Sequence, residues 1–117
     1  MVTLTMLADG TIAKYTAVCI GRFDNTIAQA MWPDKNMMSS IVGLALNDAG
    51  DGASVEVLIL GIVSDPVFSF IRQKPIYIGS GGYLTQTIPN QSVYAIGKAT
   101  ATNSIFVSPS QLYLLKN

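Results

Sequence analysis

The sequence predicts an all-β domain, either a small β-barrel or a β-sandwich of about eight to ten short strands. Short runs of β-branched and aromatic residues recur about every eight to twelve residues, and clusters of Gly, Asn, Asp, Pro and Ser separate them. No window longer than about ten residues has the apolar spacing of an amphipathic helix. The length of 117 residues suits a single domain with one core.

The first third of the chain is expected to contain three strands. Residues 2–7 alternate between apolar and Thr side chains, which is typical of a strand with one covered face, and a turn at 8–10 follows. The next strand, 15–20, ends at Gly21. Asp24-Asn25 is a hairpin turn signal, so 27–31 is expected to return as a strand; the alternative is a short helix over 26–32, ended by Pro33.

The middle of the chain predicts a hairpin. Residues 41–46 form one strand, and the sequence NDAGDG at 47–52 is the strongest turn signal in the chain. Residues 55–63 are long and apolar on both faces, which indicates a central strand, with Gly61 marking a bulge or bend. Glu56 alternates with valines and is expected to face solvent.

The last third predicts five more strands, at 75–78, 83–88, 93–99, 105–107 and 111–115. The turn at 79–82 (GSGG) is interpreted as a hairpin turn and not a phosphate loop, because a strand pattern follows it where a helix would be needed. The segment 41–57 is weakly echoed by 95–107, which indicates two similar hairpins in the same barrel.

Charge is sparse and balanced. The chain contains seven Lys and Arg residues and seven Asp and Glu residues, so its net charge is zero. Charged residues make up 12% of the chain, against about 25% in ordinary soluble domains. With no basic excess, we expect no nucleic-acid partner. The weakly charged surface favours burial against protein partners over a fully solvated state. The two arginines, Arg22 and Arg72, are expected to be solvated, with salt bridges or hydrogen bonds to the backbone of a partner as the alternatives.

Candidate catalytic chemistry is thin. The chain has no histidine, which removes the commonest general base and zinc ligand. Its single cysteine, Cys19, lies in an apolar strand, where a buried structural role is expected. Asn47, Asp48 and Asp51 are interpreted as a solvated turn, because their spacing does not match a calcium loop. We therefore expect no enzymatic activity, no cofactor and no metal.

Targeting signals are also missing from the pattern. We expect no signal peptide and no membrane contact, since the uncharged stretch 75–97 contains prolines and glycines that a membrane helix would not tolerate. A single cysteine cannot form an internal disulfide, which suits synthesis in a reducing cytoplasm.

Candidate interface residues fall into three groups. Residues 1–14 are expected to be an N-terminal arm or a first strand, ahead of a β-domain over 15–117, and the arm could add to a neighbouring sheet edge. The residues predicted to contact partners are Val2, Leu4 and Met6 in this segment, the apolar group Met31, Trp32, Met37 and Met38, and Arg72. Phe68 and Phe70 are expected in the core.

The pattern of small residues and strands resembles the β-domain of tailed-phage capsid decoration (cement) proteins, with related domains in head fibres and tail fibres. The resemblance covers about 15–110 and is carried by VGLALNDAGDGASVEV at 42–57, LGIV at 60–63, PIYIG at 75–79, GYLT at 82–85, IGKA at 96–99 and IFV at 105–107. It implies a non-enzymatic virion protein, usually a homotrimer, that binds the major capsid protein on the outside of the shell and stabilises it.

Two alternatives remain open. One is the base of a head fibre, or a tail-fibre or receptor-binding module, which would share the fold. The other is a small enzyme or ligand-binding barrel, for which the loop carboxylates Asp24, Asp48, Asp51 and Asp65 are the candidates.

Overall fold

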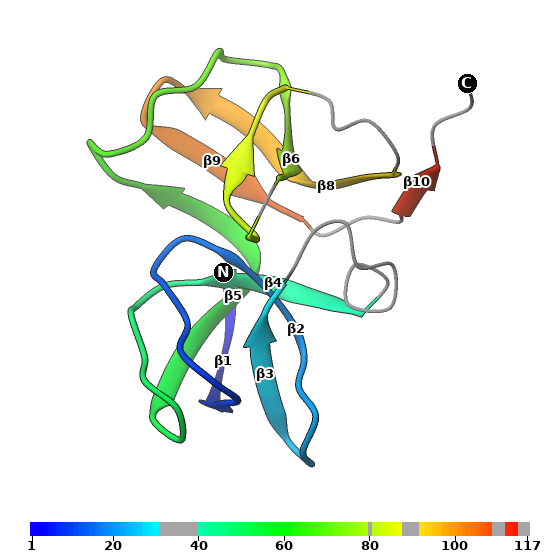
Figure 1. Ribbon diagram of the computed structural model, residues 1–117. Coiled ribbons are helices and arrows are strands. Elements are labelled where there is room, and N and C mark those ends of the chain that lie inside the picture. Colours follow the sequence, from blue (N-terminus) through cyan, green and yellow to red (C-terminus); the bar gives the residue numbers. More distant parts are fainter. Residues whose placement is uncertain (31–39, 80, 88–91, 109–111, 115–117) are drawn as a thin grey trace.

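The computed structural model describes residues 1–30, 40–79, 81–87, 92–108 and 112–114, and these residues form strands and loops without a helix (Figure 1). The all-β prediction is confirmed, and the short helix over 26–32 is wrong where residues are described, because 26–29 is a strand. The strands are β1 (Val2–Ala8), β2 (Ala17–Ile20), β3 (Thr26–Gln29), β4 (Ile41–Ala45), β5 (Ser54–Ser64), β6 (Pro75–Ile78), β7 (Leu84–Thr85), β8 (Ser92–Ala101), β9 (Ser104–Val107) and β10 (Leu112–Leu114).

Five strands form a closed barrel in the order β1-β3-β2-β4-β5, and β5 pairs with β1 to complete it. Neighbouring strands are antiparallel except β1 and β3, which run parallel. The β1–β3 contact is short, with Leu7 opposite Thr26 and Ala8 opposite Ile27. The barrel is therefore closed at one end of β1, and the rest of that strand is paired with β5 alone among the described strands.

A second sheet continues from the barrel in the order β5-β9-β8-β6-β7, and β10 pairs with β8. The eleven-residue strand β5 belongs to both parts, because residues up to Leu60 pair with β1 and β4 and residues from Gly61 pair with β9. Gly61 has φ +145°, and a Cβ there would lie 2.8 Å from Cγ of Met1. The predicted bend at this glycine therefore marks the passage from barrel to second sheet.

Two hydrophobic clusters fill the molecule, one inside the barrel and one between the barrel and the second sheet. The first consists of Ala8, Ile12, Val18, Ile27, Ala45, Ala49, Val55 and Val57. The second consists of Ala17, Cys19, Ala30, Leu44, Leu58, Phe68, Ile76, Ile78, Tyr94, Ile96, Ala99, Ile105 and Val107. Strands β2, β4 and β5 supply both clusters, which explains why their sequences are apolar on both faces.

The sequence echo corresponds to two hairpins, β4–β5 and β8–β9, each with a glycine at a close backbone contact. A Cβ on Gly43 would collide with the carbonyl of Leu58, and a Cβ on Gly97 would collide with the carbonyl of Phe106. The two hairpins do not share one barrel as the sequence suggested, because β8 and β9 lie in the second sheet. The repeated sequence pattern therefore reflects the same close contact between two strands at a glycine, and not the same position in the fold.

Candidate interaction surface

The segment predicted to be an arm or a first strand contains β1, which pairs antiparallel with β5 of the same chain from Val2 to Leu7. Its other edge pairs with β3 only at Leu7 and Ala8. Over residues 2–6 this edge has no strand partner within the part of the chain that the structure describes. Edge strands in natural proteins are commonly protected by charge, proline or a bulge pointing outward. Residues 2–8 contain no charged residue and no proline, and the irregularity in the β1–β5 register lies at the end of the strand, between Val2 and Thr3. The regular part of this edge can therefore accept another strand.

Exposure along β1 rises towards its N-terminal end. Val2, Leu4, Met6 and Ala8 share one face of the strand, because side chains alternate. Ala8 is buried, Met6 is half-buried against the barrel core, and Leu4 and Val2 are 46% and 48% exposed. Of the three residues predicted here as interface residues, Val2 and Leu4 therefore present apolar surface, whereas Met6 contributes mainly to the barrel core.

Exposed apolar side chains continue from β1 onto β5 and β9. Leu60 lies opposite Val2 and is 44% exposed, and Ile62 lies opposite Phe106, both of them exposed. We call Val2, Leu4, Leu60, Ile62 and Phe106 the apolar strip. Sequence reasoning missed the last three, because apolar residues in predicted strands are normally assigned to the core. The glycine at position 61 was the available signal, since the strand loses one of its covered faces there.

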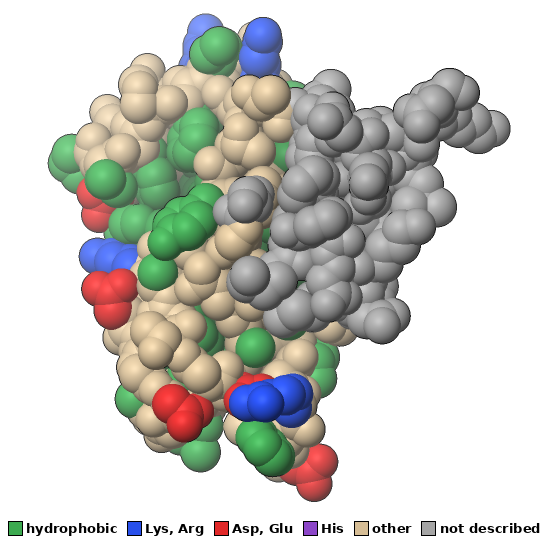
Figure 2. Space-filling view, in the orientation of Figure 1, with side chains coloured by type: hydrophobic (Ala, Val, Ile, Leu, Met, Phe, Trp, Pro, Cys, Tyr) green, Lys and Arg blue, Asp and Glu red, His purple; other side chains and the backbone are tan. Residues whose placement is uncertain are grey.

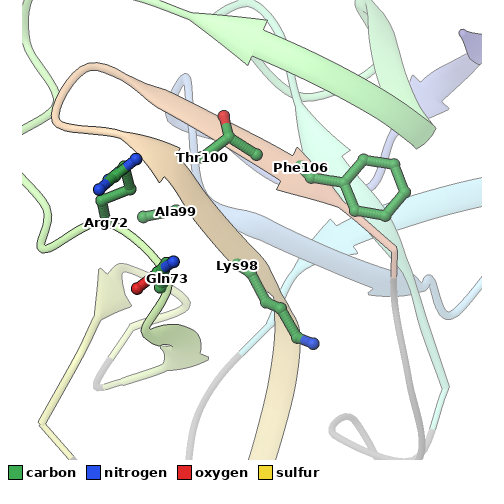
Figure 3. A pocket seen from close by; sticks show the side chains of 6 residues that line it. All are labelled: Arg72, Gln73, Lys98, Ala99, Thr100 and Phe106. Atoms are coloured by element: carbon green, nitrogen blue, oxygen red, sulfur yellow. The ribbon is translucent and has the colours of Figure 1, made fainter.

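Arg72 lies apart from β1, in the turn before β6. It lines an open groove of about 550 Å³ together with Gln73, Lys98, Ala99, Thr100 and Phe106 (Figure 3). Phe106 belongs to both the groove and the apolar strip. The predicted residues Met31, Trp32, Met37 and Met38 lie outside the described residues. The structure thus brings Val2 and Leu4 together, and it places Arg72 in a different surface feature.

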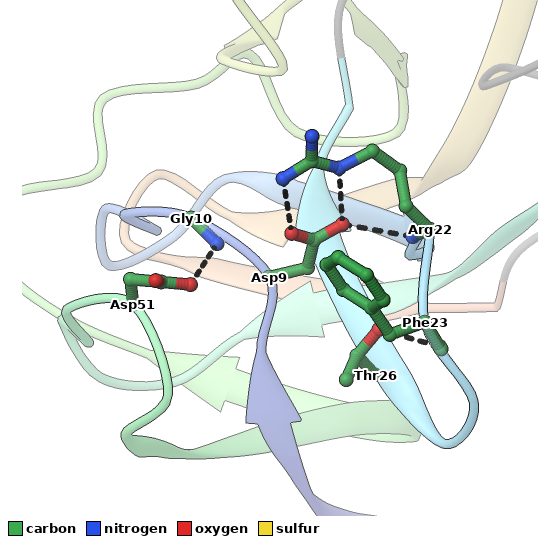
Figure 4. A network of polar contacts seen from close by, with 6 residues as sticks. All are labelled: Asp9, Gly10, Arg22, Phe23, Thr26 and Asp51. Atoms are coloured by element: carbon green, nitrogen blue, oxygen red, sulfur yellow. Dashed lines mark hydrogen bonds and ion pairs between the residues drawn. The ribbon is translucent and has the colours of Figure 1, made fainter.

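The opposite end of the molecule is tied by an ion pair between Asp9 and Arg22 (Figure 4). Arg22 Nη2 donates to Asp9 Oδ1 at 2.8 Å, and Arg22 Nε and the Arg22 backbone N–H donate to Oδ2 at 3.1 and 2.8 Å. These hydrogen bonds lower the pKa of Asp9 to about 2. Arg22, expected to be solvated or to form a salt bridge, is largely exposed and fixes the turn that follows β1 through this ion pair.

Three of the four loop carboxylates considered for a ligand site hold loops in place. Asp48 Oδ1 accepts a hydrogen bond from the Lys14 N–H at 2.7 Å, and Asp51 Oδ1 accepts one from the Gly10 N–H at 2.9 Å. Asp65 accepts hydrogen bonds from Tyr15 Oη and the Val67 N–H. These hydrogen bonds stabilise turns and loops. Within the described residues, no group of three or more Cys, Asp or Glu side chains is placed to hold a metal ion.

Asp24 is the fourth of these carboxylates. It sits at the β2–β3 hairpin tip, and among the described residues it has no hydrogen bond or ion pair. Its neighbour Phe23 is 63% exposed. The tip therefore presents an acidic and an aromatic side chain side by side, a combination that suits contact with another protein.

Comparison with known proteins returns no match, either to a family model or to a curated protein. In the described part of the chain, no helix is long and apolar enough to cross a membrane. A proposal for the function therefore depends on the open edge of β1, the apolar strip and the other surface features described above.

Proposed function

We propose that this protein is a capsid decoration protein, which binds the outside of a phage shell and stabilises it. The observation that carries the proposal is the uncharged edge of β1, which has no strand partner over residues 2–6 among the described strands and is continuous with the apolar strip. A surface of this kind binds by strand addition, in which main-chain hydrogen bonds supply affinity and alternate side chains supply specificity. The resemblance of the strand pattern at 42–107 to decoration proteins supports the same function.

In this proposal the partner of β1 is a strand of the major capsid protein. The backbone of residues 2–6 pairs with it, and Val2 and Leu4 become buried at the mouth of the barrel. Burying apolar surface stabilises such a contact by about 25 cal/mol for each Å². Asp48, Asp51 and Asp65 hold loops in place and take no part in chemistry, so the protein acts mechanically. In the virion it is a homotrimer, made in the host cytoplasm.

The first experiment measures how many copies of this chain are present in purified phage particles, relative to the major capsid protein, by quantitative mass spectrometry. A ratio near one, or a fixed simple fraction of it, supports decoration of the whole shell. A few to tens of copies would instead support the head-fibre or tail-fibre alternative. Absence from the particle would overturn the proposal.

A pair of variants tests the surface itself. Leu4→Lys places a charge at the open edge, where it blocks strand addition. Val67→Lys is the matched control, because Val67 is 70% exposed in a loop of the other sheet. We expect particles to bind the control normally and the Leu4→Lys protein at least about tenfold more weakly, with both proteins folded by circular dichroism. Equal binding of the two variants would show that attachment does not use β1.

A further inference from the structure

Charge is distributed unequally between the two parts of the molecule. Among the described residues, the barrel part up to Leu60 carries five carboxylates and two cations, whereas the rest carries Asp65 and three cations, Arg72, Lys74 and Lys98. On the face seen in Figure 2, the cations at the top of the molecule have no acidic neighbour, and those lower down lie beside acidic side chains. Each copy therefore has an acidic end and a cationic end, which are complementary. Because the net charge of the chain is zero, two copies do not repel each other overall.

The cationic end contains the groove that Arg72 lines, and the backbone holds its walls in place. The Gln73 N–H donates to the Ala99 carbonyl at 2.8 Å, and the Ala99 N–H donates to the Lys74 carbonyl at 3.1 Å, which pins the 71–74 turn to β8. Lys98 lies opposite Phe106 in the β8–β9 ladder. The groove therefore combines an exposed aromatic ring with two cations, and no described carboxylate lines it (Figure 3).

The acidic end contains a matching projection, the β2–β3 hairpin tip with Phe23 and Asp24. The tip is ordered by its own hydrogen bonds, because the Thr26 N–H and Thr26 Oγ1 both donate to the Phe23 carbonyl, at 3.3 and 2.7 Å. The Arg22 guanidinium lies over the Phe23 ring but is already neutralised by Asp9 (Figure 4). The free charge that the tip presents is therefore the carboxylate of Asp24. A pre-ordered loop binds without a large loss of conformational entropy.

We propose that the groove of one copy binds the hairpin tip of a second copy, with Asp24 paired to Arg72 and Lys98 and Phe23 packed against Phe106. The β2–β3 hairpin tip in the barrel and the β8–β9 hairpin of the second sheet, whose residues line the groove, lie at opposite ends of the molecule (Figure 1). Tip and groove therefore do not meet within one chain. The contact is heterologous, which produces a ring where the rotation between copies closes and an open chain where it does not. It goes beyond capsid attachment, because it concerns contact between copies in free solution.

Charge reversal on the purified full-length chain tests the contact by sedimentation velocity. Asp24→Lys and the double variant Arg72→Glu/Lys98→Glu are each expected to weaken self-association at least about tenfold, the size typical of close interfacial charge pairs. The triple variant restores opposite charges and is expected to recover association. Raising the salt concentration from about 50 mM to about 500 mM is expected to weaken the wild-type contact.

Two single reversals serve as controls. Glu56→Lys changes an exposed barrel carboxylate away from the tip, and Lys14→Glu changes an exposed barrel cation away from the groove. Both are expected to associate as the wild type does. The proposal is overturned by a wild type that stays monomeric at all concentrations, by association that survives Asp24→Lys or Arg72→Glu/Lys98→Glu, or by a triple variant that fails to recover. Copy number in particles is measured separately, so failure here leaves the capsid proposal standing.

Discussion

Arg22 donates three hydrogen bonds to the carboxylate of Asp9, two from its guanidinium and one from its backbone N–H (Figure 4). The Asp9 side chain is 3% exposed although Arg22 is 78% exposed. The Asp9 N–H also donates to the Ile27 carbonyl at 2.7 Å. The pair therefore fastens the end of β1 to β3 at the place where the barrel closes through only two residue pairs.

Acid is expected to weaken this closure. The pKa of Asp9 is about 2 in the folded protein against 3.8 as the ordinary value, so its contribution is complete above about pH 4 and is lost as the pH falls towards 2. Unfolding by urea, followed across this range, measures the effect. Asp9→Asn is expected to be less stable at neutral pH and to show a flatter pH dependence. Glu56→Gln, which removes an exposed carboxylate without a described partner, should behave as the wild type; equal slopes for Asp9→Asn and wild type would contradict the assignment.

Alkaline titration tests the contact between Tyr15 and Asp65. Burial, aided by the 2.7 Å hydrogen bond to Asp65, raises the pKa of Tyr15 to about 12. The contribution of Tyr15 to the free energy of unfolding is therefore complete below about pH 10 and is lost as the pH rises towards 12. Phenolate absorbance is expected to show a late step near pH 12, and Tyr15→Phe should reduce that step by one tyrosine. Burial also raises the pKa of Tyr94, so the comparison with the variant, and not the step alone, identifies Tyr15. If the last step persists undiminished in the variant, another tyrosine carries it.

The strands were predictable because β-branched runs and turn residues mark them locally. Residues 55–63 and 105–107 fall within or coincide with observed strands, and 83–88 contains the short β7. Which face of each strand is covered was less predictable. Leu60 and Ile62 are exposed because β5 leaves the barrel at Gly61, and that depends on pairing with β9, far along the chain.

The candidate surface was predictable only in part, for the same reason. The alternation at Val2 and Leu4 marked β1, but nothing local showed that β5 would pair with one edge of it and leave the other open. A salt bridge was among the expectations for Arg22, but its partner was not predictable. The pairing with Asp9 depends on the β1–β3 contact, which joins segments about 20 residues apart. Contacts between distant segments thus determine which side chains are exposed on the surface, whereas the local sequence pattern determines where the strands form.

Cys19 is expected to resist thiol reagents in the folded protein. Its side chain is fully buried in the cluster between the barrel and the second sheet, as the sequence predicted. Reaction with a coloured disulfide reagent should be slow at neutral pH and become fast in denaturant, with its rate following the opening of the fold. Rapid labelling without denaturant would show that the two sheets separate readily.

The close backbone contact at Gly97 yields a sharper test of the β8–β9 hairpin. A Cβ at this position meets the Phe106 carbonyl, so Gly97→Ala must push the two strands apart and is expected to cost about 1–3 kcal/mol of stability. Gly43→Ala should act similarly through the Leu58 carbonyl. Gly50→Ala is the matched control, because a Cβ there has nothing within 4 Å.

Chemical denaturation of the three glycine variants compares these costs directly. Gly50→Ala is expected to be neutral or to stabilise by up to about 1 kcal/mol, since alanine restricts the unfolded chain. If Gly97→Ala destabilises while Gly43→Ala does not, the strand contact in the barrel is looser than that in the second sheet. If Gly97→Ala and Gly50→Ala unfold with the same free energy, β8 and β9 do not approach each other as closely as described. The groove that Lys98 and Phe106 line would then not have the shape described above.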